Sequence, residues 1–365
     1  MTGPEPARSR LLRIEGLPIL AVLAILVGAF MVAAPDVFLG YRIYMSFLTT
    51  VPPLLVLAVG LTLVIAAGEI DLSFPSVIAL AGWILAYFTH VLGSSWLGLL
   101  LALVAGAVVG YLNGLVVARL GIPSIIATLA TQFLWGGLTT VFSQGLSYSM
   151  GEAEDLLLWK LLVGRIGPFP VQALWALAIA VALWLVLNRH RFGEHLLFIG
   201  DNARVAEVVG VNVARERIRA FVLMGVMAAV ASALLTLENK SFFNTQGSGY
   251  LLEVMAAVFI GGTSVFGGRA SVVGSVAGSF IIGMVEAGLV ATGLQGFWVR
   301  AVVGAVFLAA VIGHLLIEEP ERGHALVRAL RARLEAPGRR RSPGRRFAGT
   351  PGGTPAGGRD EEQQR

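Results

Sequence analysis

The side chains that could do chemistry are few, and they form no familiar catalytic pattern. The sequence has no Cys, which excludes disulfides, thiolate metal sites and a Cys nucleophile. Its five His are scattered and include no H-E-x-x-H pair, so we expect no metal site. A G-x-x-x-x-G-K-[ST] phosphate loop and a G-x-S-x-G elbow are also absent. We therefore expect no covalent catalysis and no cofactor bound by this chain.

The most distinctive polar segment is an acidic turn between two apolar runs. It consists of Gly68, Glu69, Ile70, Asp71, Leu72 and Ser73. Gly68 permits a tight exit from the preceding helix. Ser73 is the predicted N-cap of the next helix, and Pro75 suits its first turn. The turn is either a capped connection between two helices or a contact for another chain.

Polar residues inside apolar segments are the candidates for the wall of a conduit. They are Asn113, Thr128, Thr131, Gln132 and Glu286. The middle three are spaced i, i+3 and i+4, so they share one helical face. That face should point to a partner helix or to a conduit, and both readings stay open. Glu286 is costly unless it is paired, and Arg300 is its expected partner, either for structure or for gating.

The composition indicates that most of the chain lies in the apolar core of a lipid bilayer. Of 365 residues, 56% are hydrophobic and 13% are charged, whereas soluble domains average about 25% charged. Apolar windows predict an all-α polytopic membrane protein with about ten transmembrane helices, and a count of nine or eleven stays open. The windows are 17–34, 49–68, 74–92, 96–118, 123–142, 171–188, 218–237, 250–266, 271–292 and 297–316.

Two windows are expected to be irregular. Pro52 and Pro53 predict an irregular outer start for the second window, because proline removes a backbone donor. Only residues 267–270 separate the eighth and ninth windows, so we expect a re-entrant or broken pair there.

The distribution of Lys and Arg residues predicts how the chain is oriented in the membrane. With the N-terminus inside, 22 of the 27 Lys and Arg residues lie on the inner side, which predicts that both termini are cytoplasmic. The chain then divides into a cytoplasmic N-terminal segment (1–16), a transmembrane domain (17–316) and a basic, largely disordered cytoplasmic tail (317–365). Four of the five net positive charges lie in the last 48 residues, so the basic balance does not indicate nucleic acid binding.

Small residues recur at helical spacing within the apolar windows. The 45 Gly include the pairs Gly106 with Gly110 and Gly274 with Gly278. A small-x-x-x-small spacing lets two helices approach closely, so we expect tight helix packing at both pairs.

Four segments, in order, resemble motifs of one transporter family. The first is the acidic turn, similar to G-x-I-D-L-S. The second is Asn113-Gly114-Leu115 followed by residues 122–131, which contain I-P-S-I-I-A-T-L-A-T. The third comprises Gly200, Asp201, Asn202, Ala206, Gly210 and Asn212, and the fourth Gly261, Gly262, Thr263, Ser264, Gly267 and Gly268. The chain resembles, over about 40–315, the permease of binding-protein-dependent ABC importers of the ribose, xylose and galactose branch.

Two departures from the family pattern are visible. Phe74-Pro75-Ser76 stands where V-G-S is usual, and Ala270 stands where Gly is frequent. The related amino-acid permeases carry an N-F-A-H-G-like turn in place of I-D-L-S, so the acidic turn favours a sugar.

The resemblance implies a multi-pass protein of the bacterial plasma (inner) membrane, surrounded by lipid. Its implied partners are ABC ATPase subunits, which hold the ATP and Mg²⁺, an extracytoplasmic sugar-binding protein, and a second permease copy in a homodimer or heterodimer. A short helix over residues 201–209 is expected to dock on the ATPase. We expect Asp201 or Asn202 to cap it, Arg204 and Glu207 to pair along it, and Gly210 to end it.

Two alternatives remain at this stage. The chain could be an ABC permease for another solute, such as a branched-chain amino acid, a nucleoside or an autoinducer. It could also be a stand-alone secondary transporter, although no run of buried acids suggests a proton relay.

Overall fold

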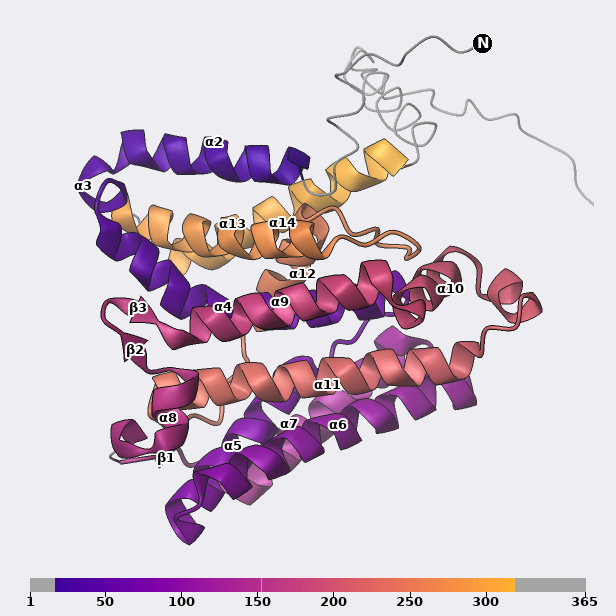
Figure 1. Cartoon of the computed structure of the whole chain (residues 1–365), viewed down its shortest axis with the longest axis horizontal. Coiled ribbons are helices and arrows are strands. Elements are labelled where there is room, and N and C mark those ends of the chain that lie inside the picture. Colours follow the sequence, from indigo (N-terminus) through magenta and orange to yellow (C-terminus); the bar gives the residue numbers. More distant parts are fainter. Residues whose placement is uncertain (1–16, 152, 294, 319–365) are drawn as a thin grey trace, which may run out of the picture. The chain divides into compact units, whose positions relative to one another are not determined.

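A computed structural model describes residues 17–151, 153–293 and 295–318 (Figure 1). Predictions for residues 1–16 and for the tail beyond 318 lie outside the described residues. The helices are α2 (Leu17–Ala33), α3 (Pro35–Phe38), α4 (Tyr41–Ala66), α5 (Phe74–Leu92), α6 (Ser95–Leu120), α7 (Ser124–Ser143), α8 (Leu157–Leu162), α9 (Val171–Arg189), α10 (Arg191–Val208), α11 (Val213–Glu238), α12 (Tyr250–Ile260), α13 (Val272–Ala291) and α14 (Phe297–Glu318).

Short β-strands and a 3₁₀ turn complete the described part of the chain. They are β1 (Tyr148–Ser149), η1 (Ala153–Asp155), β2 (Arg165–Ile166), β3 (Phe169–Pro170) and β4 (Ser241–Phe242). Strand β1 pairs antiparallel with β4, and β2 pairs antiparallel with β3. Figure 1 shows β2 and β3 at one end of α9 and α10 at its other end.

Each of the ten apolar windows contains a helix, as predicted. Seven helices in the described residues are long and apolar enough to cross a membrane: α4, α5, α6, α7, α9, α11 and α13. Shorter apolar stretches lie at Pro18–Ala33, Tyr250–Ile260 and Trp298–Ile312. The chain is a polytopic helical protein, while ten crossings and the side of each terminus stay predictions.

Helix α4 corrects the prediction of an irregular start. It begins at Tyr41 and runs without a break through Pro52 and Pro53. Proline is tolerated within such a helix because neighbouring helices satisfy the backbone carbonyl groups that lose their hydrogen-bond donor. Every α4 residue from Val51 to Ala66 is buried, and α4 contacts α9, α11, α12 and α13. It is the central helix of the described bundle.

Helix α12 is shorter than its window. It ends at Ile260, not at residue 266, because a turn over residues 261–271 takes the last part of the window. Eleven residues make a helix of about 16 Å, roughly half the thickness of a bilayer core. Eleven residues, in place of the expected four, therefore separate the two helices, and a re-entrant or broken pair stays a prediction.

Glycines bring α6 and α11 into backbone contact, as the small-residue spacing predicted. A Cβ on Gly106 would lie 2.3 Å from the carbonyl oxygen of Gly225, and one on Gly110 would lie 2.2 Å from that of Phe221. Helices α12 and α13 meet in the same way, since a Cβ on Gly278 would lie 2.0 Å from the oxygen of Ala257. These crossings have no room for a methyl group.

The α6–α11 crossing can be tested by thermal unfolding. We expect Gly106→Ala to lower the Tm of the detergent-solubilised protein by about 5–10 °C, since overpacking costs ~1–3 kcal/mol and more against backbone. Gly28→Ala is the matched control, because a Cβ on Gly28 meets no atom within 4 Å. Equal Tm values for the two variants would contradict the close crossing.

Candidate functional site

Backbone from three distant segments meets at four motif glycines, which we call the glycine junction: Gly68, Gly200, Gly267 and Gly268. A Cβ on Gly200 would lie 2.0 Å from the carbonyl oxygen of Ala66 and 2.3 Å from the nitrogen of Gly268. A Cβ on Gly267 would lie 2.7 Å from the Cα of Gly68. The segments can approach this closely only because no side chain intervenes.

The glycine junction is fixed by backbone geometry. Gly68 has φ +75°, Gly267 +87° and Gly268 +74°, all in the left-handed region that favours glycine. The N–H of Gly268 donates to the carbonyl of Ala66 at 3.1 Å, at the end of α4. The turn after α4 and the turn after α12 are thereby joined directly.

A hydrogen-bond network holds the acidic turn beside the glycine junction. The Asp71 carboxylate accepts bonds from the Ser73 N–H at 2.7 Å and from its hydroxyl at 2.6 Å. Burial raises the pKa of Asp71, and the two bonds from Ser73 oppose that rise. Ser73 precedes α5, but its side chain does not cap the helix as predicted, because its hydroxyl is committed to Asp71.

Residues of the second motif anchor the same turn. Asn113 donates from Nδ2 to the Ser73 hydroxyl at 2.7 Å. The N–H of Ile70 donates to Ser124 Oγ at 3.1 Å, and that of Leu72 to Thr128 Oγ1 at 3.0 Å. All four motifs therefore meet within one set of contacts, of which the acidic turn is the centre.

An ion pair ties the acidic turn to the start of α11. Arg217 Nε lies 2.9 Å from Glu69 Oε1, and both side chains are mostly buried. One residue earlier, the buried Glu216 lies 3.2 Å from Arg219 and 3.4 Å from His195 of α10. The sequence analysis missed both contacts, because α11 was expected to begin at residue 218 instead of Val213.

Helix α10 contains the predicted short helix as its second half. The backbone kinks at Asn202 (φ −156°, ψ 101°), and Asn202 Oδ1 accepts a bond from the Val205 N–H at 3.1 Å. Asn202 is thus the cap, and Asp201 is not. Gly210 ends the segment with φ +93°, and Asn212 caps α11 by accepting from the Arg215 N–H.

The second half of α10 exposes an apolar surface, which we call the valine ridge: Val205, Val208 and Val209. Their exposed fractions are 56%, 87% and 69%. Ala206 faces inward and is buried. Arg204 and Glu207 are exposed, and the structure records no ion pair between them in this part of the chain. The ridge was missed in the sequence analysis, although its valines lie at helical spacing.

The fourth motif forms the turn between α12 and α13. Thr263 and Ser264 are buried. Thr263 Oγ1 accepts a bond from the Ser271 N–H at 3.3 Å, and the Ser264 N–H donates to the Arg269 carbonyl at 2.9 Å. A Cβ on Gly261 would lie 2.5 Å from Gly274, so this turn is closely packed against the start of α13.

The residues predicted to share a conduit face do not stay together. Thr128 is buried and binds the acidic turn, and Thr131 donates to the Thr128 carbonyl at 3.2 Å. Gln132 instead lines a cavity of about 430 Å³ between α5, α7 and residues 244–251. Asn113 is fully buried beside the acidic turn. Of this set, Gln132 is the residue that lines this cavity.

Glu286 has a different principal neighbour from the one predicted. Its carboxyl group lies beside that of Glu253 in α12. Arg300, the predicted partner, attracts the Glu253 carboxylate. The three groups form one cluster between α12, α13 and α14.

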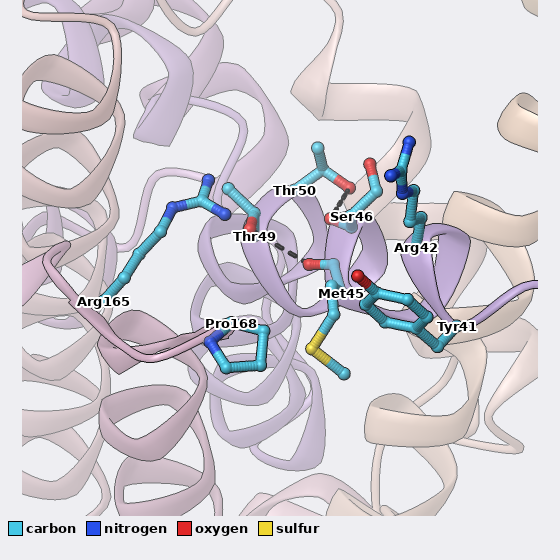
Figure 2. Close-up of a pocket in the computed structure, with 8 residues that line it drawn as sticks. All are labelled: Tyr41, Arg42, Met45, Ser46, Thr49, Thr50, Arg165 and Pro168. Carbon is cyan, nitrogen blue, oxygen red and sulfur yellow. Dashed lines mark hydrogen bonds between the residues drawn. The ribbon is translucent and has the colours of Figure 1, made fainter.

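A polar pocket lies at the opposite end of α4 from the glycine junction. Its volume is about 360 Å³, and Figure 2 shows Arg165 reaching towards the hydroxyl groups of α4, with Arg42 beyond Ser46 and Thr50. The hydroxyls of Thr49 and Thr50 donate to carbonyls one turn earlier. Two arginines line this pocket, which we call the positive pocket, and Arg165 also forms an ion pair with Glu238 at 3.9 Å.

Among the described residues, no three His, Cys, Asp or Glu side chains form a group that could hold a metal ion. The site is built from glycine backbone, buried polar anchors and an exposed apolar ridge. These contacts join a surface segment of α10 to the helix bundle, and no catalytic group is found among the described residues of this site.

Comparisons with known proteins agree with this reading. Residues 43–311 match the family described as the branched-chain amino acid transport system / permease component. The ribose import permease proteins of Escherichia coli and Bacillus subtilis are 33% and 35% identical to this chain, over 70% of it and 80% and 79% of their own lengths. The fructose import permease protein of Rhizobium meliloti is 32% identical over 80% of this chain and 84% of its own length. The chain therefore belongs to this family of permeases, the membrane-spanning transport subunits of ABC importers.

Proposed function

We propose that the chain is the permease subunit of an ATP-driven importer of a pentose or hexose, and that it couples the sugar path to separate ATPase subunits. The observation that carries this proposal is its likeness, at about a third identity over 70% or more of the chain, to relatives named for ribose and fructose. A relative named for L-arabinose transport is 33% identical over 70% of the chain. These three solutes share neutral, polyhydroxylated chemistry.

The valine ridge is the proposed contact with the ATPase. An apolar helical surface in water favours a partner groove that buries it, at about 25 cal/mol per Å² of apolar area. The kink at Asn202 adjoins Gly200, so displacement of the ridge would act directly on the glycine junction. The ATPase, with its bound ATP and Mg²⁺, would in this way bias the turns after α4 and α12.

The positive pocket is the proposed contact with the sugar-binding protein. On the topology predicted from the charges, it lies at the outer face, and its α4 residues are about 24–38 Å along the helix from the cytoplasmic end. Arg42 and Arg165 suit carboxylates on the docking surface of that partner. Helix α7, the least buried of the seven candidate spans, is the proposed site for covering by a second permease copy, in a homodimer or a heterodimer.

The proposal is tested by purification from the native host. We expect two ATPase subunits and a binding protein to co-purify, and ribose, fructose or arabinose to raise the Tm of that binding protein. A binding protein stabilised by leucine alone would favour the amino-acid alternative. Uptake that continues without any ATPase but stops with an ionophore would favour a secondary transporter.

Substituting the valine ridge should uncouple the importer. We expect Val208→Asp to reduce ATP-dependent sugar uptake by at least about tenfold, because a charge would enter the apolar contact. Replacing Arg204 and Glu207 together, or Gly210→Ala, is expected to act in the same direction without loss of membrane insertion. Leu39→Asp is the control, because Leu39 is 70% exposed in the connection before α4. Normal coupling in all three variants would refute the docking role.

Reversing the charge of the positive pocket should weaken docking of the binding protein. We expect Arg42→Glu combined with Arg165→Glu to raise the Kd for the loaded binding protein at least about tenfold, and the wild-type Kd to rise with salt. Lys160→Glu serves as control, since Lys160 is exposed on α8 but does not line the pocket. An unchanged Kd in the double variant would exclude this pocket from the interface.

A further inference from the structure

The cavity of about 430 Å³ that Gln132 reaches has a wall without fixed charge. It lies between α5, α7 and the segment that leads into α12, and we call it the amide cavity. Gln132, Asn244 and Gln246 supply amides to its wall, Phe133 supplies an aromatic ring, and Gly136 and Gly137 leave space along α7. None of the described residues that line it is charged.

Residues 244–251, which follow β4, pack between helices of the bundle and form one side of the amide cavity. Gln246 donates from Nε2 to Thr236 Oγ1 at 2.8 Å and to Ser232 Oγ at 3.2 Å, both on α11. Ser232 in turn donates to the Ile78 carbonyl of α5 at 2.6 Å. Gly247, with φ +95°, passes so close to α5 that a Cβ would lie 2.3 Å from the Pro75 oxygen. The segment is thus held at a fixed depth between α5 and α11.

Helix α12 begins at the amide cavity. Gly249 and Leu251, at its first turn, line the cavity, and no side chain caps the helix. With 11 residues, α12 is about half as long as a bilayer core is thick. Ser248 and Gly249, which precede its first residue, line the cavity and are exposed.

Two amide groups of the wall are incompletely satisfied. The Oε1 atoms of Gln132 and Gln246 are buried and have no hydrogen-bond partner among the described residues. A buried acceptor without a partner costs about 1–3 kcal/mol, so a rotation of either side chain that brings its oxygen to a donor in the cavity would be favoured. Asn244 is fixed to α7 by Thr140 Oγ1 at 3.2 Å, which keeps the opposite side of the wall in place.

Amides with an aromatic ring and no charge match one class of solute. Amide groups donate and accept hydrogen bonds, as sugar hydroxyls do, and the Phe133 ring offers an apolar face for the C–H side of a sugar. An amino acid or an ion would leave its charges unpaired there. We propose that the amide cavity is a transient binding site for a neutral polyhydroxylated solute on its path through the permease. This inference rests on the proposed function and assigns the site within it.

Filling the amide cavity tests the proposal. Gly137 on α7 has no atom within 4 Å of a built Cβ, so Gly137→Leu should fold and occupy the cavity. We expect it to reduce sugar uptake in proteoliposomes, with ATPase subunits and binding protein present, by at least about tenfold. Stimulation of ATP hydrolysis by the loaded binding protein should remain. Gly28→Leu on α2 is the matched control, because Gly28 also has open space around it.

A labelling experiment gives a second readout that does not depend on uptake. The chain has no Cys, so Gly137→Cys carries a single thiol. We expect ribose, fructose or arabinose, imported at millimolar concentration during turnover, to slow labelling of that thiol by a maleimide at least about threefold. Leucine should not slow it, and labelling of Gly28→Cys should not change.

The outcomes separate this inference from the proposed function. Failure of the wild-type assembly to import any sugar would overturn the proposed function and this site with it. Sugar import by the wild type, together with wild-type uptake by Gly137→Leu or labelling of Gly137→Cys that no sugar slows, would overturn the amide cavity alone.

Discussion

The contact between the Ala66 carbonyl and the Gly268 N–H is the constraint on which the rest of the site depends. It joins the end of α4 to the turn after α12, and Gly200 lies against it with no space for a methyl group. The three segments can meet only if all of them lack side chains at the point of contact. Two further features extend from this contact. The acidic turn begins at Gly68, and the kink at Asn202 and the valine ridge follow Gly200.

This geometry gives the permease two mechanically different parts. Helices α6 and α11 are locked by glycines into backbone contact, and the buried half of α4 packs beside α11. Packed interiors of this kind switch between discrete arrangements and do not deform continuously. By contrast, α7 carries most of its residues at the surface, and α12 begins and ends within short glycine-containing segments. The amide cavity lies between α5, α7 and the segment that leads into α12.

Hydropathy predicted where the helices lie, and its failures have physical reasons. The α12 window was drawn too long because Val265 and Phe266 continue the apolar run, although a turn begins at Gly261. Proline at 52 and 53 suggested a break, but surrounding helices support the backbone of α4 there. Asn202, not Asp201, caps the short helix, and the sequence allowed either. The meeting of Gly68, Gly200 and Gly267 could not be predicted, since no local pattern records which distant backbones touch.

The sequence indicated which residues belong to the candidate site. It did not indicate which of them anchor the acidic turn and which line a cavity. Thr128 and Gln132 share a helical face, yet the first binds the acidic turn and the second lines the amide cavity. A polar face within a membrane segment indicates that something polar lies opposite, without saying what. Only the positions of α5 and of residues 244–251 distinguish a structural anchor from a wall of a cavity.

The valine ridge has a consequence for how cells assemble this transporter. Val208 is 87% exposed in a segment that the charge distribution predicts to face the cytoplasm. Under the proposed docking role, a subunit made in excess of its ATPase displays an apolar helix to water. Chaperones and membrane proteases recognise such surfaces, so the ridge would distinguish unassembled from assembled subunits. On that basis, the amount of permease in the membrane would follow the supply of its ATPase.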